Sequence, residues 1–395
     1  MNNIVKFEGN GTAMDANETF IENDKENKAA LARAVVKIKV FGVGGGGGNV
    51  LKRLVENDFN DVELVAVNTD TRALNFFVNT PIKSIQIGGN LTRGHGTGGK
   101  FEIGEEAAKR DAETLKKMML GADMIFITAT MGGGAGTGAA PVIAAIAKSL
   151  GILTVGVITV PFTFEGNRKM RIANEGIAKM QASMDALVIV KNDNLLKLMD
   201  SRNLSVVDSF KAADTVLRQA IRCIAELILK SGFINVDFAD VTTIFQQSDS
   251  SDAILGIGQS NINAVKAVQQ AMESPLIDRS LKGARGIILN VTGDENLSLH
   301  EVNEAAQYIY SQTDGEVNII FGVVIDEDMN GIIQAMIIAT DFKDSVALKT
   351  PDNSMTRLRS RTSHDFNIPV PQFPNKTPKS PNVIPLFQNG RDKNE

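Results

Sequence analysis

Short apolar runs alternate with helix-like segments over the first half of the chain. The runs are rich in β-branched residues and end in glycine or polar clusters, which is typical of strands buried on both faces. They span residues 35–43, 62–67, 82–87, 124–128, 153–160 and 186–190. Because helical segments join them over short connections, the pattern predicts an α/β fold with a Rossmann-like, doubly wound parallel sheet that binds ligands at the carboxyl ends of its strands.

Two long helices are predicted from apolar residues at helical spacing. One covers residues 105–120, and the other covers residues 209–231 and is apolar on more than one face, which suits a helix that connects two domains. Beyond the second helix the alternation resumes up to residue 341 and predicts a second, smaller α/β domain. Its expected strands are residues 253–258, 286–292, 318–326 and 332–340, and its expected helices are residues 263–272 and 299–311.

The two ends of the chain lack these patterns. The first 34 residues are polar without periodicity, and after residue 341 the composition shifts to Pro, Ser, Thr, Asn and Lys, which cannot build a core. The apolar stretch 383–387 is either a docking peptide or a less polar part of the linker. The resulting division is a flexible tail (1–34), a first domain (35–208), a connecting helix (209–231), a second domain (232–341), a disordered linker (342–382) and a candidate docking peptide (383–395).

The amino-acid composition argues against several classes of protein. A net charge of -5 argues against a nucleic-acid binder, the single Cys223 excludes an internal disulfide, and three scattered histidines offer no metal site. No apolar run is long enough to span a membrane, and the first residues lack the apolar core of a signal peptide. We therefore expect a cytoplasmic protein that neither inserts into a membrane nor binds nucleic acid.

Three glycine-rich connections follow the ends of predicted strands. The densest, MGGGAGTGAAP at residues 131–141, joins a strand to an alanine-rich helix, and the other two lie at residues 44–49 and 88–99. The backbone N–H groups of such turns, together with a helix N-terminus, favour a bound anion. None of the three is followed by the Gly-Lys-Ser/Thr of a Walker motif. Because the ends of parallel strands meet at one edge of a sheet, we expect one shared phosphate site.

Five segments occur in an order that is similar to a known family. They are GGGGGN at 44–49, GGGAGTG at 132–138, PFTFEG at 161–166, FKAAD at 210–214 and NVDFAD at 235–240. They resemble the first glycine loop, the GGGTG(S/T)G signature and the PFxFEG, FxxAD and NxDxxD motifs of the tubulin/FtsZ superfamily of GTPases. Within it, they resemble the FtsZ family of bacterial cell-division filament proteins. The resemblance covers residues 35–341.

The resemblance implies GTP or GDP as the ligand, accompanied by Mg²⁺, with no protein side chain assigned to the metal. The glycine turns would hold the phosphates, and Glu165 and Asn192 would hold the ribose. Asp214 would accept hydrogen bonds from guanine N1–H and the 2-amino group, while Phe210 packs on the base. The implied nucleotide contacts are Gly45, Gly46, Gly47, Gly48, Asn49, Asn68, Gly96, Thr97, Gly98, Gly132, Gly133, Gly134, Gly136, Thr137, Gly138, Glu165, Lys169, Asn192, Phe210 and Asp214.

The resemblance also implies a catalytic segment made of Asn235, Asp237 and Asp240. A predicted helix of some twenty residues, or about 30 Å, separates this segment from the guanine site, so its acids cannot reach their own nucleotide. In a head-to-tail filament they would act on the next subunit's nucleotide, with Asp237 and Asp240 polarising the attacking water and Asn235 holding the loop. Alternatively, Asp237 merely caps the helix that follows.

The chain departs from the family pattern in the helix after Gly258, which is shorter and lacks the usual arginine, and at three places near the predicted phosphate site. Lys169 takes the place of an arginine near the phosphates, Ala135 takes the place of the signature threonine, and residues 96–101 have the sequence GTGGKF where GAGGNP is usual. An ammonium is a point charge and not a bidentate fork. These departures bear on the rate of hydrolysis more than on nucleotide binding.

The sequence therefore predicts a filament-forming GTPase, a scaffold of the bacterial septal ring. It would act at the division site and meet membrane-tethering division proteins through its C-terminal peptide. One alternative is a GTP-dependent scaffold with little hydrolysis. The other is a Rossmann NAD(P) oxidoreductase with Gly42, Gly44 and Gly47 on the pyrophosphate and Asp70 on the ribose, although such an enzyme does not need glycine turns after three strands.

Overall fold

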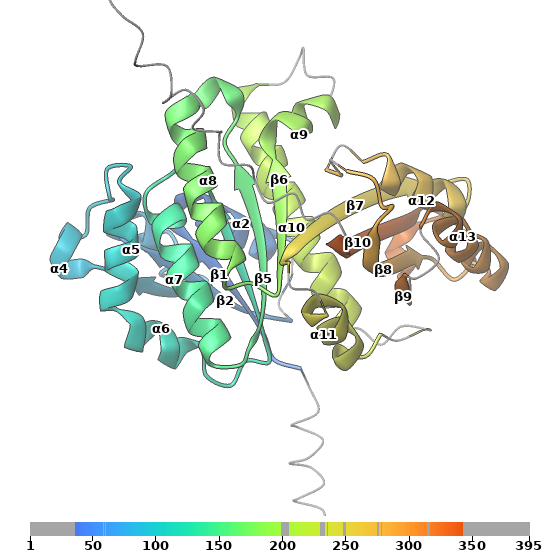
Figure 1. Ribbon diagram of the computed structural model, residues 1–395, viewed down its shortest axis with the longest axis horizontal. Helices are drawn as coiled ribbons and strands as arrows, with labels where there is room; N and C mark the ends of the chain where they lie inside the picture. The colour runs from blue at the N-terminus through green and yellow to red at the C-terminus, as the bar shows by residue number, and fades with distance from the viewer. Residues whose placement is uncertain are drawn as a thin grey trace, which may run out of the picture. The chain divides into compact units, whose positions relative to one another are not determined.

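The computed structural model describes most of residues 36–342 (Figure 1). Within that range, residues 58, 60, 199–204, 230–233, 235, 248–249, 275, 278 and 314–316 are outside the description, as are residues 1–35 and 343–395. The predicted tail, the linker after Phe342 and the candidate docking peptide therefore fall outside the described residues.

Six parallel strands form the first part of a ten-stranded sheet. They are β1 (Ile38–Val43), β2 (Glu63–Asn68), β3 (Lys83–Gln86), β4 (Met124–Thr130), β5 (Leu153–Val160) and β6 (Ala186–Lys191). Their order in the sheet is β3-β2-β1-β4-β5-β6, and each neighbouring pair is parallel. Because all of these pairs are parallel, the six carboxyl ends lie at one edge. The strand order reverses at β1, so the predicted doubly wound sheet is confirmed.

Helices cover both faces of this sheet. Side chains alternate along β1, so that Val40 packs in one core with α2 and α10, and Phe41 packs in the opposite core with α5 to α8. The bounds are α2 (Gly44–Glu56), α5 (Phe101–Arg110), α6 (Ala112–Met119), α7 (Ala135–Ser149), α8 (Asn167–Gln181) and α10 (Val206–Leu229). The shorter helices α3 (Thr71–Asn75), α4 (Gly89–Thr92), η1 (Thr163–Glu165) and α9 (Asn192–Leu198) lie in the connections.

The remaining four strands continue the same sheet. They are β7 (Asp252–Ser260), β8 (Ala284–Gly293), β9 (Asn318–Ile325) and β10 (Ile333–Phe342), in the order β7-β10-β8-β9. β10 is antiparallel to both of its neighbours, and β7 joins β6 through a short parallel pairing. Helices α11 (Phe238–Gln246), α12 (Ala264–Met272) and α13 (Leu299–Gln312), with the short η3 (Glu327–Met329), complete this part.

Helix α10 lies between the two groups of strands (Figure 1). Leu217, Ile221 and Ile224 pack in one core with residues of β1 and β4 and with residues of β8 and β10. An amide bridge adds to this core, because Gln334 on β10 accepts hydrogen bonds from Gln219 on α10 at 3.1 Å and from Gln259 on β7 at 2.8 Å. The predicted connecting helix is thus packed against both parts, and it begins three residues earlier than predicted, at Val206.

Two other elements of the structure differ from the sequence prediction. Residues 105–120 form two helices instead of one, because the chain breaks at Asp111, whose carboxylate accepts a hydrogen bond from Gly88 N–H at 2.6 Å. β10 includes Phe342, which the prediction placed in the linker. None of the helices within the described residues is long and apolar enough to cross a membrane.

Candidate functional site

The glycines after β1 form the first turns of a helix, whereas those after β4 lie partly in a turn, at residues 132–134, and partly in the first turn of the next helix. α2 begins at Gly44 and α7 begins at Ala135, so both helices begin inside the segments that the sequence analysis took as connections. The two helix starts pack tightly together, since a Cβ on Gly44, where φ is +74°, would lie 2.8 Å from the backbone nitrogen of Gly136. Glycine in a helix is about 1 kcal/mol less favourable than alanine. The close approach of the two helix starts therefore explains why a glycine occupies position 44.

The third glycine-rich connection lies against the start of α7. Thr97 is buried, and a Cβ on Gly134 would collide with its hydroxyl. The hydroxyl of Thr137 accepts a hydrogen bond from Gly132 N–H at 2.9 Å. Both threonines therefore hold the turns together through their side chains.

Some of the predicted glycines face open space and others face protein. No heavy atom lies within 4 Å of a Cβ built on Gly45, Gly98 or Gly133, and only the Asp70 carboxylate comes that near to one on Gly96. The other seven are packed against neighbouring protein atoms: Gly46, Gly47, Gly48, Gly132, Gly134, Gly136 and Gly138. The three turns therefore meet, and each presents at least one open glycine beside the N-termini of α2 and α7.

The connection between β5 and α8 carries two further predicted residues. Glu165 accepts a hydrogen bond from Phe162 N–H at 2.9 Å, and its other oxygen lies 2.9 Å from the Lys169 ammonium. Asp193 accepts from Thr163 N–H at 3.0 Å, which ties this connection to the start of α9. These contacts bring Glu165 and Lys169 together and hold their connection beside the residues that follow β6.

Asn192 has an unsatisfied acceptor. It is the first residue of α9 and is 1% exposed, yet its Oδ1 has no hydrogen-bond partner within the described part of the chain. An unpaired buried acceptor costs about 1 to 3 kcal/mol. A ligand hydroxyl that donates to Asn192 would remove this cost.

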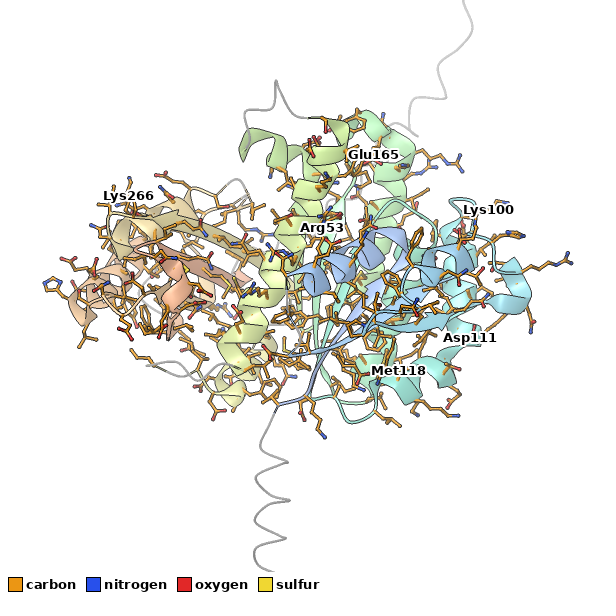
Figure 2. The ribbon with its side chains drawn as sticks, turned by 180° about the vertical axis from the view of Figure 1, so that it is seen from behind. Arg53, Lys100, Asp111, Met118, Glu165 and Lys266 are labelled. Atoms are coloured by element: carbon orange, nitrogen blue, oxygen red, sulfur yellow. The ribbon has the colours of Figure 1, made fainter. Side chains whose placement is uncertain are left out.

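Phe210 and Asp214 lie four residues apart and so share one face of α10. The Phe210 ring packs edge-on against Phe162 at 5.3 Å between centroids. Asp214 Oδ2 accepts a hydrogen bond of 3.3 Å from the Arg53 Nε of α2, the helix that faces α10 in Figure 2. Burial raises the pKa of the Asp214 carboxyl above its ordinary value, against the opposing effect of Arg53.

Two cavities lie along α2, one beside each half of the helix, and share Asn49 and Lys52 in their walls. The smaller, of about 230 Å³, lies beside Gly44, Gly45 and Gly48 and is also lined by Asn68, whose Oδ1 accepts from Asp70 N–H. The larger, of about 440 Å³, contains Phe210 and Asp214. Backbone donors at one end and an aromatic ring and a carboxylate at the other can bind an anion that is attached to a planar polar ring.

Sequence reasoning missed Arg53. Its partner Asp214 is 161 residues away, so no local pattern connects the two. One signal was present, because Arg53 follows the predicted phosphate contact Asn49 by four residues and therefore lies on the same face of the helix.

The predicted catalytic acids lie far from these turns. Asp237 and Asp240 are exposed at the start of α11, which Figure 1 shows at the end of α10 away from α9. The 24 residues of α10 span about 36 Å at 1.5 Å per residue. Asp237 also caps α11 by accepting from Ala239 N–H at 3.4 Å, and Asn235 lies outside the described residues.

Comparison with known proteins identifies the family. A model described as the tubulin/FtsZ family GTPase domain matches residues 37–200, and one of the FtsZ family C-terminal domain matches residues 251–343. An empty FtsZ dimer from M. jannaschii is 40% identical, with 80% of this chain and 92% of that chain covered and a TM-score of 0.74. The chain belongs to the tubulin/FtsZ family. A tryptophan-to-tyrosine mutant of the same FtsZ also matches at 40% identity, with 81% and 96% covered and a TM-score of 0.75.

The predicted family is thereby confirmed, and a tubulin/FtsZ-family protein is a GTPase that binds GTP and GDP. The alternative of an NAD(P) oxidoreductase is wrong, and Asp70 instead caps α3 and pairs with Arg72. A GTPγS-bound protofilament of CetZ2 from Haloferax volcanii shares the fold at 23% identity, with 79% and 95% covered and a TM-score of 0.66.

Proposed function

We propose that this GTPase assembles head to tail into filaments and hydrolyses GTP at the contact between subunits. The observation that carries the proposal is the separation within one chain of the glycine turns from the acids at the start of α11. If both groups act in hydrolysis, two subunits must complete each site. A contact between unlike ends of identical subunits repeats without closing and so produces a filament.

In this proposal the two cavities along α2 hold the nucleotide. The open glycines and the N-termini of α2 and α7 donate N–H groups to the phosphates. Glu165 and Asn192 accept from the ribose hydroxyls, which satisfies the unpaired Oδ1 of Asn192. Asp214 exchanges Arg53 for the N1–H and 2-amino donors of guanine, and Phe210 packs on the base.

Mg²⁺ would enter this site on the phosphate oxygens. Within the described part of the chain, no group of three or more His, Cys, Asp or Glu side chains could hold a metal ion. Mg²⁺ usually keeps several waters and binds through substrate phosphates, and there it neutralises the charge that develops on them. The chain's own residues position the phosphates by backbone donation, and Asp237 and Asp240 of the neighbour orient the attacking water.

Assembly is supported by two of the similar structures, one of which is an FtsZ dimer and the other a CetZ2 protofilament. We further propose that the filament serves as a scaffold of cell division in the cytoplasm at the septum. Membrane-tethering division proteins would bind its C-terminal peptide.

A sedimentation assay with GTP, GDP and ATP tests this function when polymer and released phosphate are scored together. We expect polymer and phosphate with GTP alone. Polymer without phosphate release would favour a scaffold with little hydrolysis, and phosphate release without polymer would contradict the shared site.

The alternative of a GTP-dependent scaffold with little hydrolysis is supported by Ala135, the first residue of α7. Replacing Ala135 with threonine would add a hydroxyl beside the phosphates and should raise GTP turnover several-fold to about a hundredfold, as one preorganised donor does. Phosphate release per assembled subunit measures this. The matched control is Ala135→Val, which has the same shape without the hydroxyl and should not raise turnover. Equal turnover in the two variants would mean that the missing hydroxyl does not limit hydrolysis.

A further inference from the structure

An apolar groove on the second group of strands takes no part in the nucleotide site. It has a volume of about 480 Å³ and lies between α13 and β9. Its walls are mostly aliphatic: Ile234, Leu297, Leu299, Val302, Val323 and Ile325, with Glu295 beside them. Leu299 is 77% exposed and Ile234 is 41% exposed. Exposed apolar side chains that gather in one hollow are typical of a binding surface.

The groove includes an open sheet edge. β9 is the last strand of the sheet and pairs with β8 on one side only. On its other side Val323 N–H donates to the carbonyl of Ile234 at 3.2 Å, in an isolated antiparallel bridge. Because backbone groups alternate along a strand, Ile325 presents its N–H on the same side as Val323. This edge therefore accepts an extended segment, and Ile234 occupies only one position of it.

Acidic residues lie in and beside the lining of the groove, within a stretch of the sequence that is rich in them. Residues 286–342 contain ten Asp and Glu residues and no Lys or Arg. Glu295 lines the groove, and Asp294 and Asp326 are chain neighbours of its lining residues. An occupant with apolar side chains and a positive charge fits this surface best.

We propose that the groove binds the C-terminal segment of the same chain, Val383–Phe387. Residues 343–395 have the opposite charge balance, with nine Lys and Arg against five Asp and Glu. The sequence Val-Ile-Pro-Leu-Phe supplies the apolar side chains, and Lys379 and Arg391 lie on either side of it. The apolar residues cover Leu299 and Ile234, and the basic residues face Glu295 and its neighbours. A docked segment is thereby withheld from other partners.

The length of the chain permits this contact. Phe342 pairs with Ala284 at the start of β8, whereas the groove lies near Gly293 at its end, about 30 Å away at 3.3 Å per residue. Forty residues separate Phe342 from Val383. A chain of that length reaches at most about 130 to 140 Å, so it can cover the span, and its attachment to the same molecule gives a high effective concentration.

The experiment places a fluorescent label at Gln388→Cys in the full-length protein with GDP bound. Cys223 will not compete for the label, because it is buried and burial raises its pKa to about 12. The anisotropy of the label, with and without an excess of an unlabelled peptide of residues 379–391, gives the docking equilibrium constant. Leu299→Glu in the groove and Phe387→Ala in the segment should each lower that constant about tenfold or more. Glu295→Lys should lower it to a smaller extent, and added salt should weaken docking.

The matched control is Ile262→Glu, which also places a charge at an exposed isoleucine of this part of the chain but outside the groove. It should leave the anisotropy unchanged, and GTP affinity should be the same in all these variants. Anisotropy that neither Leu299→Glu nor Phe387→Ala changes would overturn the proposal. A signal that disappears on dilution would also overturn it, because the segment would then occupy the groove of another copy.

Discussion

Replacing Asp240 with alanine should leave GTP binding intact and lower GTP turnover by about a hundredfold or more, the usual effect of removing a group that assists proton transfer. Asp240 is exposed in the first turn of α11, away from the glycine turns. It does not cap the helix, since Asp237 does, so its removal should cost little stability. Nucleotide affinity and phosphate release, measured on the same assembled sample, separate binding from chemistry.

Thr243→Ala is the matched control for Asp240→Ala. Thr243 is exposed one turn further along α11, and its hydroxyl donates only to the carbonyl of Ala239 at 2.8 Å. Its loss should leave turnover unchanged. A normal rate of phosphate release by the Asp240→Ala protein would show that the acids of α11 play no part in hydrolysis.

The strands could be predicted because their signal is local. The run at residues 153–160 is apolar and β-branched throughout and coincides with β5, which is buried on both faces. The direction of β10 could not be predicted, because a strand covered on both faces has the same pattern whether its neighbours are parallel or antiparallel. The break between α5 and α6 was also hidden, since it depends on a hydrogen bond from Gly88, which is 23 residues away.

The glycine-rich segments of the candidate site could also be predicted, because their signal is local. The positive φ of Gly44 is a property of the local backbone, whereas Gly134 is required by its close contact with Thr97, which lies in another glycine-rich segment. The pairing of Arg53 with Asp214 is set by how α2 lies against α10, which no periodicity encodes. The unpaired oxygen of Asn192 cannot be predicted from the sequence either, because it follows from the burial of that side chain in the fold.

Replacing Asp214 with asparagine should change the preferred base from guanine to xanthine. The carboxylate offers two acceptors, which match the N1–H and 2-amino donors of guanine. Asparagine offers one acceptor and one donor, which match the N1–H and the C2 carbonyl of xanthine. An unpaired buried polar group costs about 1 to 3 kcal/mol, so GTP affinity should fall and XTP affinity should rise by about tenfold each. Competition against a fluorescent nucleotide measures both, and unchanged preference would remove Asp214 from the guanine site.

The pH dependence of binding provides a second measurement of Asp214. Only the ionised carboxyl accepts both hydrogen bonds, and burial raises the pKa of Asp214 above its ordinary value. GTP affinity should therefore decrease on acidification at a higher pH than an exposed aspartate would require. The affinity of Asp214→Asn for XTP should lack this decrease, because asparagine does not titrate.

The two substitutions together decide whether hydrolysis occurs between subunits. A chain with both Asp214→Asn and Asp240→Ala should bind XTP and, alone, release almost no phosphate from it. When it is assembled with wild-type subunits in GTP, its XTP should be hydrolysed, because the wild-type neighbour supplies the intact α11. The released phosphate is followed with XTP labelled on its γ-phosphate.

If each chain instead acts on its own nucleotide, wild-type subunits cannot rescue XTP hydrolysis at any mixing ratio. Polymer that contains both chains but releases no phosphate from XTP would therefore contradict the shared site while leaving the xanthine preference intact.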